Sequence, residues 1–254
     1  VTANIAVTLA RMGLKVGVLD ADIYGPSMPL MFDLEGHRPL AKEIDGKSKM
    51  EPLENYGVKL LSIGFFTKPD QAVIWRGPMA SKALKQLIFD SNWGELDFLL
   101  IDLPPGTGDI HLSIVQSLPI TGAIVVSTPQ QIALADARKG VAMFQQETIQ
   151  IPVLGIIENM SGHICPKCGH EDNIFGKGGA KEMASEYSID VLGSVPIDTN
   201  LRQSMDCGKP IVIEDKNSPI SQAYFNIGRS ITAKISNLNK DFSRKFPNIV
   251  VEDS

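Results

Sequence analysis

Three aspartates in this sequence have the types and spacing of a site that handles phosphate and magnesium. Asp20 and Asp22 stand at alternate positions directly after an apolar run, in the segment DADIYGPS at 20–27. Asp102 closes a second apolar run, FLLID at 98–102. Carboxylate oxygens are the ligands that Mg²⁺ prefers, and an aspartate beside the metal can orient an attacking water. A single aspartate after a strand is as often a helix cap, so the prediction depends on the three occurring together.

The segment after Asp102 has the composition of a loop that contacts phosphate. It reads LPPGTGD at 103–109, where two prolines stiffen the chain and Gly106 and Gly108 let backbone N–H groups approach a γ-phosphate closely. The glycines would also let the loop move when the phosphate leaves, and Asp109 closes the segment. Helix capping alone does not require two prolines and two glycines in this order.

Cys165 and Cys168 form a Cys-x-x-Cys pair, a spacing found in zinc, iron–sulfur and redox sites. The chain has only 3 cysteines, too few for a secreted disulfide framework. Two thiolates cannot complete a site of four ligands. Three interpretations stay open: a cluster shared by a symmetric dimer, a zinc ion that also uses His163 or His170, and a redox dithiol. Spacing alone favours zinc.

The elements that must position these residues are short apolar runs that alternate with helical stretches. Strands are expected at 15–19, 58–62, 98–101, 123–127, 153–158 and 191–195, and helices at 79–90, 134–146, 180–187 and 218–238. This alternation predicts an α/β fold with a doubly wound, mostly parallel sheet, whose ligands bind at the carboxyl ends of the strands. We expect a single domain at 1–238, with a Cys-x-x-Cys insertion loop at 160–175, a polar excursion at 37–52 and a C-terminal tail at 239–254.

Composition narrows the choice of partners. The 254 residues are 43% hydrophobic and 21% charged, with a formal net charge of −5. Because no basic field covers the chain and no apolar run approaches the length of a membrane span, neither a nucleic acid nor a membrane is an expected partner.

Four motifs taken in order make the sequence recognisable: DADIYGPS at 20–27, WRGPM at 75–79, DLPPGTGD at 102–109 and CPKC at 165–168. Together they resemble the Mrp branch of the MinD/ParA-type P-loop ATPases, over residues 1–236. The resemblance implies a MinD/ParA-like P-loop NTPase fold, ATP and Mg²⁺ as cofactors, and weak ATP hydrolysis.

The resemblance also implies roles for single positions. Asp22 would orient the attacking water, and Asp102 would be the Walker B aspartate. The other nucleotide contacts implied by the resemblance are Asp20 at the magnesium, Gly106, Gly108 and Asp109 in switch II, Asn159 at the adenine edge, and Pro196 and Asp198 in the loop that closes over the base. The amide of Asn159 suits that role because it can both donate to and accept from an adenine edge.

The same resemblance reverses the preference at the cysteine pair. In that family the pair bridges a labile [4Fe–4S] cluster between two subunits, so Cys165 and Cys168 are expected to bind a cluster across a homodimer and deliver it to recipient apo-proteins. ATP binding and slow hydrolysis would gate binding or release. The alternatives are a ParA/MinD-like positioning ATPase and a zinc-stabilised nucleotide switch. The expected compartment is the cytoplasm, or the mitochondrial matrix if the protein is eukaryotic.

One departure from the family concerns its phosphate loop. These ATPases carry Gly-Lys-Gly-Gly-x-Gly-Lys-Ser/Thr before the first helix, whereas this sequence opens inside a helical apolar pattern formed by Ile5, Leu9 and Met12. We therefore expect the sequence to be a fragment that lacks the first strand and the Walker A loop. Such a fragment is expected to bind ATP poorly, to be inactive and to fold poorly, while the intact parent hydrolyses ATP.

Overall fold

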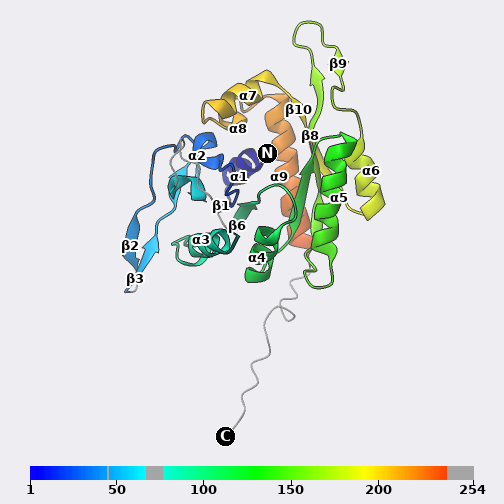
Figure 1. The fold of residues 1–254 in the computed structure, drawn as a ribbon. Helices are drawn as coiled ribbons and strands as arrows, with labels where there is room; N and C mark the ends of the chain where they lie inside the picture. The colour runs from blue at the N-terminus through cyan, green and yellow to red at the C-terminus, as the bar shows by residue number, and fades with distance from the viewer. Residues whose placement is uncertain (45, 67–76, 239–254) are drawn as a thin grey trace.

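The computed structural model describes residues 1–44, 46–66 and 77–238 and shows strands flanked by helices on both faces (Figure 1). Trp75 and Arg76 of the WRGPM motif lie outside the described residues. The strands form two larger sheets and one hairpin. The first sheet has the order β4 (Leu53–Asn55), β5 (Val58–Ser62), β1 (Val16–Asp20), β6 (Phe98–Asp102), and the second has the order β10 (Val191–Ile197), β8 (Val153–Ile164), β7 (Ala123–Ser127).

Strand β1 is the centre of the first sheet. All five of its residues are buried, and it pairs in parallel with β5 on one side and β6 on the other. The registers place Asp20 level with both Ser62 and Asp102. Parallel pairing in this register therefore brings the polar ends of three strands to one edge of the sheet.

Strand β8 is the centre of the second sheet and its longest strand. It pairs in parallel with β7 and β10, and its far end pairs in antiparallel fashion with β9 (Glu171–Asp172). In Figure 1 this far end projects beyond the body of the molecule as a hairpin. The predicted cysteine loop is therefore a continuation of a central strand.

Helices cover both faces, which confirms the doubly wound α/β prediction. Side chains that alternate along a strand enter different clusters: Val18 and Ile157 pack with α1 (Thr2–Arg11) and α9 (Pro219–Asn237), whereas Leu19 and Ile156 pack on the other side. That second side is covered by α3 (Gly77–Phe89), α4 (Asp109–Ser117), α5 (Gln131–Gln145) and α6 (Gly179–Tyr187). No helix in the described part of the chain is long and apolar enough to cross a membrane.

Helices α1 and α9 join the two sheets. They pack against each other, and residues of both sheets enter the cluster that they cover. Gly228 of α9 is one point of contact, because a Cβ there would lie 3.1 Å from a methyl group of Thr8. Among the described residues, β6 forms a ladder only with β1, and β7 only with β8.

Several boundaries and elements differ from those predicted. The strand expected at 153–158 continues to Ile164, and the strand expected at 191–195 continues to Ile197. The excursion expected at 37–52 contains an antiparallel hairpin of β2 (Ala41–Ile44) and β3 (Lys47–Met50). The short helices α2 (Met28–Met31), α4, α7 (Thr199–Asp206) and α8 (Ile211–Glu214) were not predicted, since tertiary packing rather than a long apolar period defines elements of this length.

Candidate functional site

The structure brings Asp20 and Asp102 together at the carboxyl edge of the first sheet. The two residues are register partners, and the backbone N–H of Ala21 donates to the carbonyl oxygen of Asp102 across 2.9 Å. The Asp20 side chain is fully buried. It accepts hydrogen bonds from the Ser62 hydroxyl at 2.8 Å and from the N–H of Met28 at 3.2 Å. These hydrogen bonds hold the carboxylate in one orientation at the base of the site.

Burial raises the pKa of both carboxyl groups. The pKa of Asp20 rises to about 6, mainly because burial disfavours its charge; the hydrogen bond from Ser62 opposes the rise and the charge of Asp102 adds to it. Burial raises the pKa of Asp102 as well, and the hydroxyl of Thr2, which donates to Asp102 Oδ1 at 2.5 Å, opposes that rise. Two adjacent buried carboxylates repel each other when both are ionised, so a bound divalent cation would stabilise the pair.

Asp22 lies on the loop that follows β1. Its Oδ1 atom accepts from the backbone N–H groups of Tyr24 at 3.1 Å and Gly25 at 3.2 Å, which closes the turn before α2. The N–H of Asp22 in turn donates to Asp20 Oδ1 at 3.2 Å. The two aspartates of the motif are therefore linked, with Asp22 half-exposed at the rim and Asp20 at the base.

The predicted switch loop occupies the same edge. Residues 105–108 are exposed, Gly106 has a φ of 98°, and Asp109 begins helix α4. A positive φ at this point requires glycine, so the sequence forms a turn whose N–H groups are free of side-chain cover. Gly108 is the N-cap residue of α4, and its extended backbone turns the chain into the helix.

His111, which follows the glycine loop in the sequence, anchors this loop. Its ring is buried, 5% exposed, and Nε2 donates to the carbonyl oxygen of Pro104 across 2.9 Å. Burial lowers the pKa of the His111 ring, opposed by the carbonyl groups of Pro104 and Gly108, so the neutral form is favoured. The sequence signal was a histidine two positions after the glycine loop. Thr2 and Ser62 were missed, since each contacts its aspartate from a segment distant in sequence.

The residues expected at the adenine lie at the carboxyl edge of the second sheet. Asn159 is a register partner of Val195, and Pro196 and Asp198 stand immediately beyond. Two expectations need correction: Asn159 lies within β8, which was predicted to end at 158, and Pro196, which was expected in a loop, is a strand residue of β10. Asp198 is the N-cap of α7, since its Oδ1 accepts from the N–H of Leu201 at 2.8 Å.

The cysteine pair occupies the tip of the β8–β9 hairpin. The N–H of Cys165 donates to the carbonyl oxygen of His170 at 2.9 Å, and the N–H of Gly169 donates to the carbonyl oxygen of Cys165 at 2.8 Å. Backbone N–H groups of Cys168 and Lys167 lower the pKa of the Cys165 thiol. The turn therefore stabilises a thiolate, which is the form that binds metals.

Neither site is a complete metal site within this chain. Among the described residues, no three His, Cys, Asp or Glu side chains are grouped so that they could hold a metal ion. For Mg²⁺ this is expected, because Mg²⁺ is commonly bound by one or two carboxylates together with phosphate oxygens and water, and Asp20 and Asp102 fit that donor set. At the hairpin, His163 does not join the thiols: its Nδ1 donates to the carbonyl oxygen of Ile197 at 3.2 Å.

The glycine-rich segment at the start of α6 has a composition similar to that of a phosphate loop: it reads GKGGAK at 176–181. The buried carboxylate of Glu158 accepts from the N–H of Ala180 at 2.9 Å and so takes a place that an anion could occupy at the start of the helix. Glu158 therefore caps α6 from within the protein.

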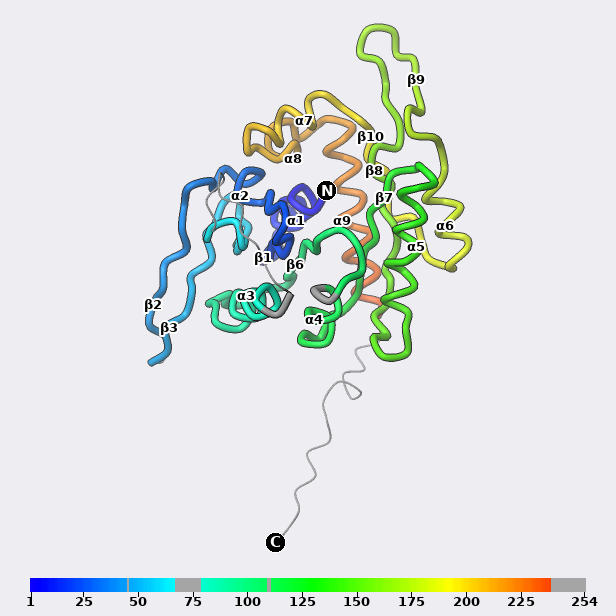
Figure 2. Tube along the Cα trace, viewed as in Figure 1, coloured from blue at the N-terminus to red at the C-terminus, as the bar shows by residue number. Residues whose placement is uncertain are grey.

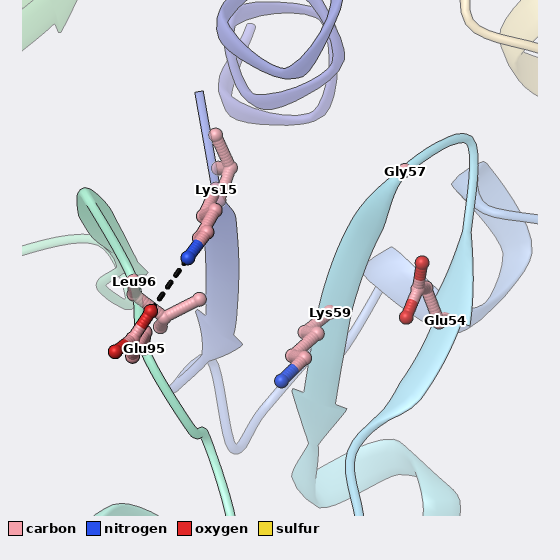
Figure 3. Close-up of a pocket in the computed structure, with 7 residues that line it drawn as sticks. Lys15, Glu54, Gly57, Lys59, Glu95 and Leu96 are labelled. Atoms are coloured by element: carbon pink, nitrogen blue, oxygen red, sulfur yellow. Dashed lines mark hydrogen bonds and ion pairs between the residues drawn. The ribbon is translucent and has the colours of Figure 1, made fainter. Parts of the chain in front are cut away.

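A shallow pocket lies at the opposite, amino edge of the first sheet (Figure 3). It has a volume of about 370 Å³ and is lined by Lys15, Lys59, Glu54 and Glu95, among others. Lys15 forms an ion pair with Glu95 at 2.6 Å, and Lys59 donates to the carbonyl oxygen of Trp93 at 2.7 Å. The pocket is separate from the aspartate site, which lies at the carboxyl ends of the same strands.

Comparison with known proteins places these features in a family. A family model described as "ParA: NUBPL iron-transfer P-loop NTPase" matches residues 1–232. The "Iron-sulfur cluster carrier protein" of Escherichia coli strain K12 is 48% identical over 232 residues, which is 91% of this chain and 62% of that protein. The "Iron-sulfur cluster transfer protein NUBPL" of Dictyostelium discoideum is 45% identical over 251 residues, covering 98% of this chain and 76% of its relative. The chain thus spans less than two thirds of the bacterial relative.

Solved structures agree with the fold. A nucleotide-binding protein from Archaeoglobus fulgidus in complex with ADP is 36% identical, with a TM-score of 0.73 over 88% of this chain and 83% of that chain. The cell division ATPase MinD of Pyrococcus furiosus has a TM-score of 0.64 at 21% identity, covering 91% of each chain, and that likeness concerns the fold alone.

Proposed function

From the premise that this chain belongs to the ParA-type family of NUBPL iron-transfer P-loop NTPases, we propose that it is the nucleotide- and cluster-binding part of an ATP-dependent iron–sulfur cluster carrier. It would hold a [4Fe–4S] cluster on Cys165 and Cys168 at a homodimer interface and transfer it to apo-proteins. The observation that carries the proposal is the joint presence of a buried aspartate pair and a thiolate-stabilising Cys-x-x-Cys turn at the carboxyl ends of the strands.

The aspartate edge supports the nucleotide half of the proposal. Asp102 and Asp20 would hold Mg²⁺, which neutralises charge on the phosphates, and Asp22 would position water at the rim. Residues 106–108 would contact the γ-phosphate through backbone N–H groups. Asn159, Pro196 and Asp198 would meet the base at the second sheet. ATP hydrolysis is proposed to be weak, because binding alone suffices to switch a conformational equilibrium.

The hairpin supports the cluster half. A [4Fe–4S] cluster on cysteine takes four thiolates, and this turn supplies two. A second copy related by a two-fold axis would supply the other two from the same surface. An exposed apolar side chain stands directly before the first thiol: Ile164 is 61% exposed. Exposed apolar groups around incomplete ligands are what an intersubunit site requires, and thiolates on a protruding hairpin can be released to a recipient.

The proposed setting is the cytoplasm, or the mitochondrial matrix in a eukaryotic cell. A relative from Arabidopsis thaliana, 41% identical over 239 residues, is named as a mitochondrial protein required for NADH dehydrogenase. For the present chain the recipient proteins and the compartment are part of the proposal.

Anaerobic reconstitution of the full-length protein with ferrous iron and sulfide tests the proposal. Wild type is compared with the Cys165→Ser/Cys168→Ser double variant, and Cys207→Ser serves as a control because Cys207 is an exposed cysteine away from the hairpin. We expect about four irons per dimer in the wild type and the control, with loss of both iron and dimer in the double variant. Zinc in place of iron, or a monomer without a cluster, would instead support a zinc-stabilised nucleotide switch.

A further inference from the structure

Strand β8 connects the two halves of the proposed function, since it carries Asn159 and leads directly to Cys165. The strand is irregular between these residues. Val195 of β10 is level with Asn159, but Ile197, two residues later, is level with His163, four residues later on β8. Strand β8 therefore contains two additional residues at this point, which makes a bulge at 160–162. Figure 2 shows the course of β8 from the second sheet out to the hairpin that it forms with β9.

Met160 gives this bulge its unusual backbone. Its φ is 56°, in the left-handed region that side chains other than glycine rarely adopt, and its side chain is 41% exposed. The conformation is thus not explained by burial of the methionine side chain. A bulge that stores such a backbone at the boundary between the sheet and the hairpin is a natural place for the hairpin to pivot.

His163 fixes the hairpin immediately beyond the bulge. It is the register partner of Asp172 on β9 and of Ile197 on β10, and its ring Nδ1 donates to the carbonyl oxygen of Ile197 at 3.2 Å. His163 therefore pairs with both strands that flank this part of β8, and it stands two residues before Cys165. Its neighbour on β10, Ile197, directly precedes Asp198, the N-cap of α7.

Helix α7 continues the connection to the aspartate edge. Its C-terminal end packs on α2 so closely that a Cβ at Gly208 would lie 2.9 Å from the carbonyl oxygen of Leu30. Helix α2 begins at Met28, whose N–H donates to Asp20 at 3.2 Å. A continuous set of contacts therefore runs from Asp20 through α2 and α7 to Ile197 and His163.

We propose that His163 is a positioning residue, and the bulge at 160–162 the hinge, through which nucleotide at the strand edges sets the position of the Cys165–Cys168 turn. The inference rests on the proposed function and specifies how the site is regulated. A nucleotide that orders Pro196 and Asp198 moves the carbonyl group of Ile197, and the hydrogen bond to His163 transmits that movement to the hairpin. Without this bond, the bulge would let the hairpin adopt its position independently of nucleotide.

The test uses the full-length protein without cluster and follows alkylation of Cys165 and Cys168 by iodoacetamide, with and without Mg-ATP. His163→Ala is compared with His163→Asn, which keeps a side-chain N–H donor, and with His170→Ala as a matched control at the exposed end of the same hairpin. Nucleotide affinity and cluster content are measured for every variant.

We expect nucleotide to change the wild-type alkylation rate by about fivefold or more, a typical size for coupling between two sites. His163→Ala should abolish the response while nucleotide and cluster still bind, His163→Asn should retain part of it, and His170→Ala should retain all of it.

A full response in His163→Ala would overturn the inference and leave the proposed function intact. So would a wild type that binds both nucleotide and cluster but shows no change in alkylation. A wild type that binds neither nucleotide nor cluster would overturn the proposed function, and the inference with it.

Discussion

Thr2 donates its hydroxyl hydrogen to Oδ1 of Asp102 across 2.5 Å, although the two residues are 100 positions apart in the chain. This hydrogen bond joins the first turn of α1 to the end of β6 and fixes the Asp102 carboxylate there. It holds the carboxylate that is proposed to meet Mg²⁺, and it opposes the rise in pKa that burial imposes on Asp102.

Replacing Thr2 with Val should destabilise the chain. The substitution keeps the shape of the side chain but leaves a half-buried carboxylate without its donor, so we expect the free energy of unfolding to fall by about 1–3 kcal/mol. Thr2→Ser keeps the hydroxyl and should lose much less. Urea unfolding of the three proteins measures the difference, and equal losses in Val and Ser variants would show that the hydroxyl is unimportant.

The raised pKa of Asp20 predicts how stability depends on pH when Mg²⁺ is absent. Its pKa is about 6 in the folded chain against an ordinary value of 3.8, so between these values the folded chain binds the proton more tightly. The contribution of Asp20 to the free energy of unfolding is therefore present below pH about 4 and is lost as the pH rises to about 6. Above that pH, Asp20→Asn should be more stable than wild type, by up to about 3 kcal/mol.

Urea unfolding in the presence of EDTA at a series of pH values tests this. Asp136→Asn, a change on the exposed face of α5, is the control and should follow the wild-type pH dependence. If Asp20→Asn also followed the wild-type curve, Asp20 would not be the group that titrates.

His111 is expected to hold the switch loop in place. His111→Leu keeps an apolar side chain but removes the bond to the carbonyl oxygen of Pro104, and this should cost about 1–3 kcal/mol of local stability. Amide hydrogen exchange over residues 103–117 should accelerate in this variant, whereas His111→Gln, which retains a donor, should remain closer to wild type. Unchanged exchange in His111→Leu would argue that the loop is held by other contacts.

The turn at the hairpin tip should make Cys165 reactive at lower pH than an ordinary cysteine. Backbone N–H groups of Cys168 and Lys167 stabilise its thiolate, which lowers its pKa. In the cluster-free protein, the rate of alkylation of Cys165 should therefore reach half of its maximum below pH about 8.5, the ordinary value for a thiol. Peptide mass spectrometry measures this rate at each pH, and the same measurement after urea unfolding should return the midpoint to the ordinary value.

Alanine substitutions at two glycines, one in α6 and one in α5, should change the free energy of unfolding in opposite directions. A Cβ at Gly179 would lie 2.6 Å from both the Pro129 carbonyl oxygen and a Leu134 methyl group, so Gly179→Ala should destabilise by about 1–3 kcal/mol. Gly140, in the middle of α5, has no atom within 4 Å of an added Cβ, so Gly140→Ala should stabilise by about 0.5–1 kcal/mol. If both substitutions lowered the free energy of unfolding by similar amounts, the close approach of Pro129 and Leu134 to Gly179 would not explain the effect.

Part of this architecture follows from sequence because apolar strands and acidic strand ends are local signals. The run at 98–102 predicts both β6 and the position of Asp102 at its carboxyl end, and the alternation of strands and helices predicts the doubly wound sheet. That Asp20 and Asp102 lie at the same edge of the sheet also follows, since parallel strands place their carboxyl ends together, but the direct pairing of β1 with β6 was not predicted.

Other features depend on contacts between distant segments and have no local signal. Nothing near Thr2 indicates that it reaches Asp102, and nothing near Glu158 indicates that it caps α6. The continuation of β8 to Ile164 was missed because the residues after Glu158 have a composition typical of a loop. Pairing with β9 and β10 keeps these residues extended. The roles proposed for Asp22, Asn159 and the cysteine pair remain predictions.

The arrangement of β6 and β7 has a consequence for handling the chain in solution. Within the described residues, each of these strands has a ladder on one side only, and their sequences, FLLID and AIVVS, contain no proline and no charge except Asp102 at a strand end. Natural sheets protect such edges with charges, prolines or covering segments, because an unprotected apolar edge recruits strands from other molecules. Aggregation that grows with protein concentration should therefore begin at these two edges.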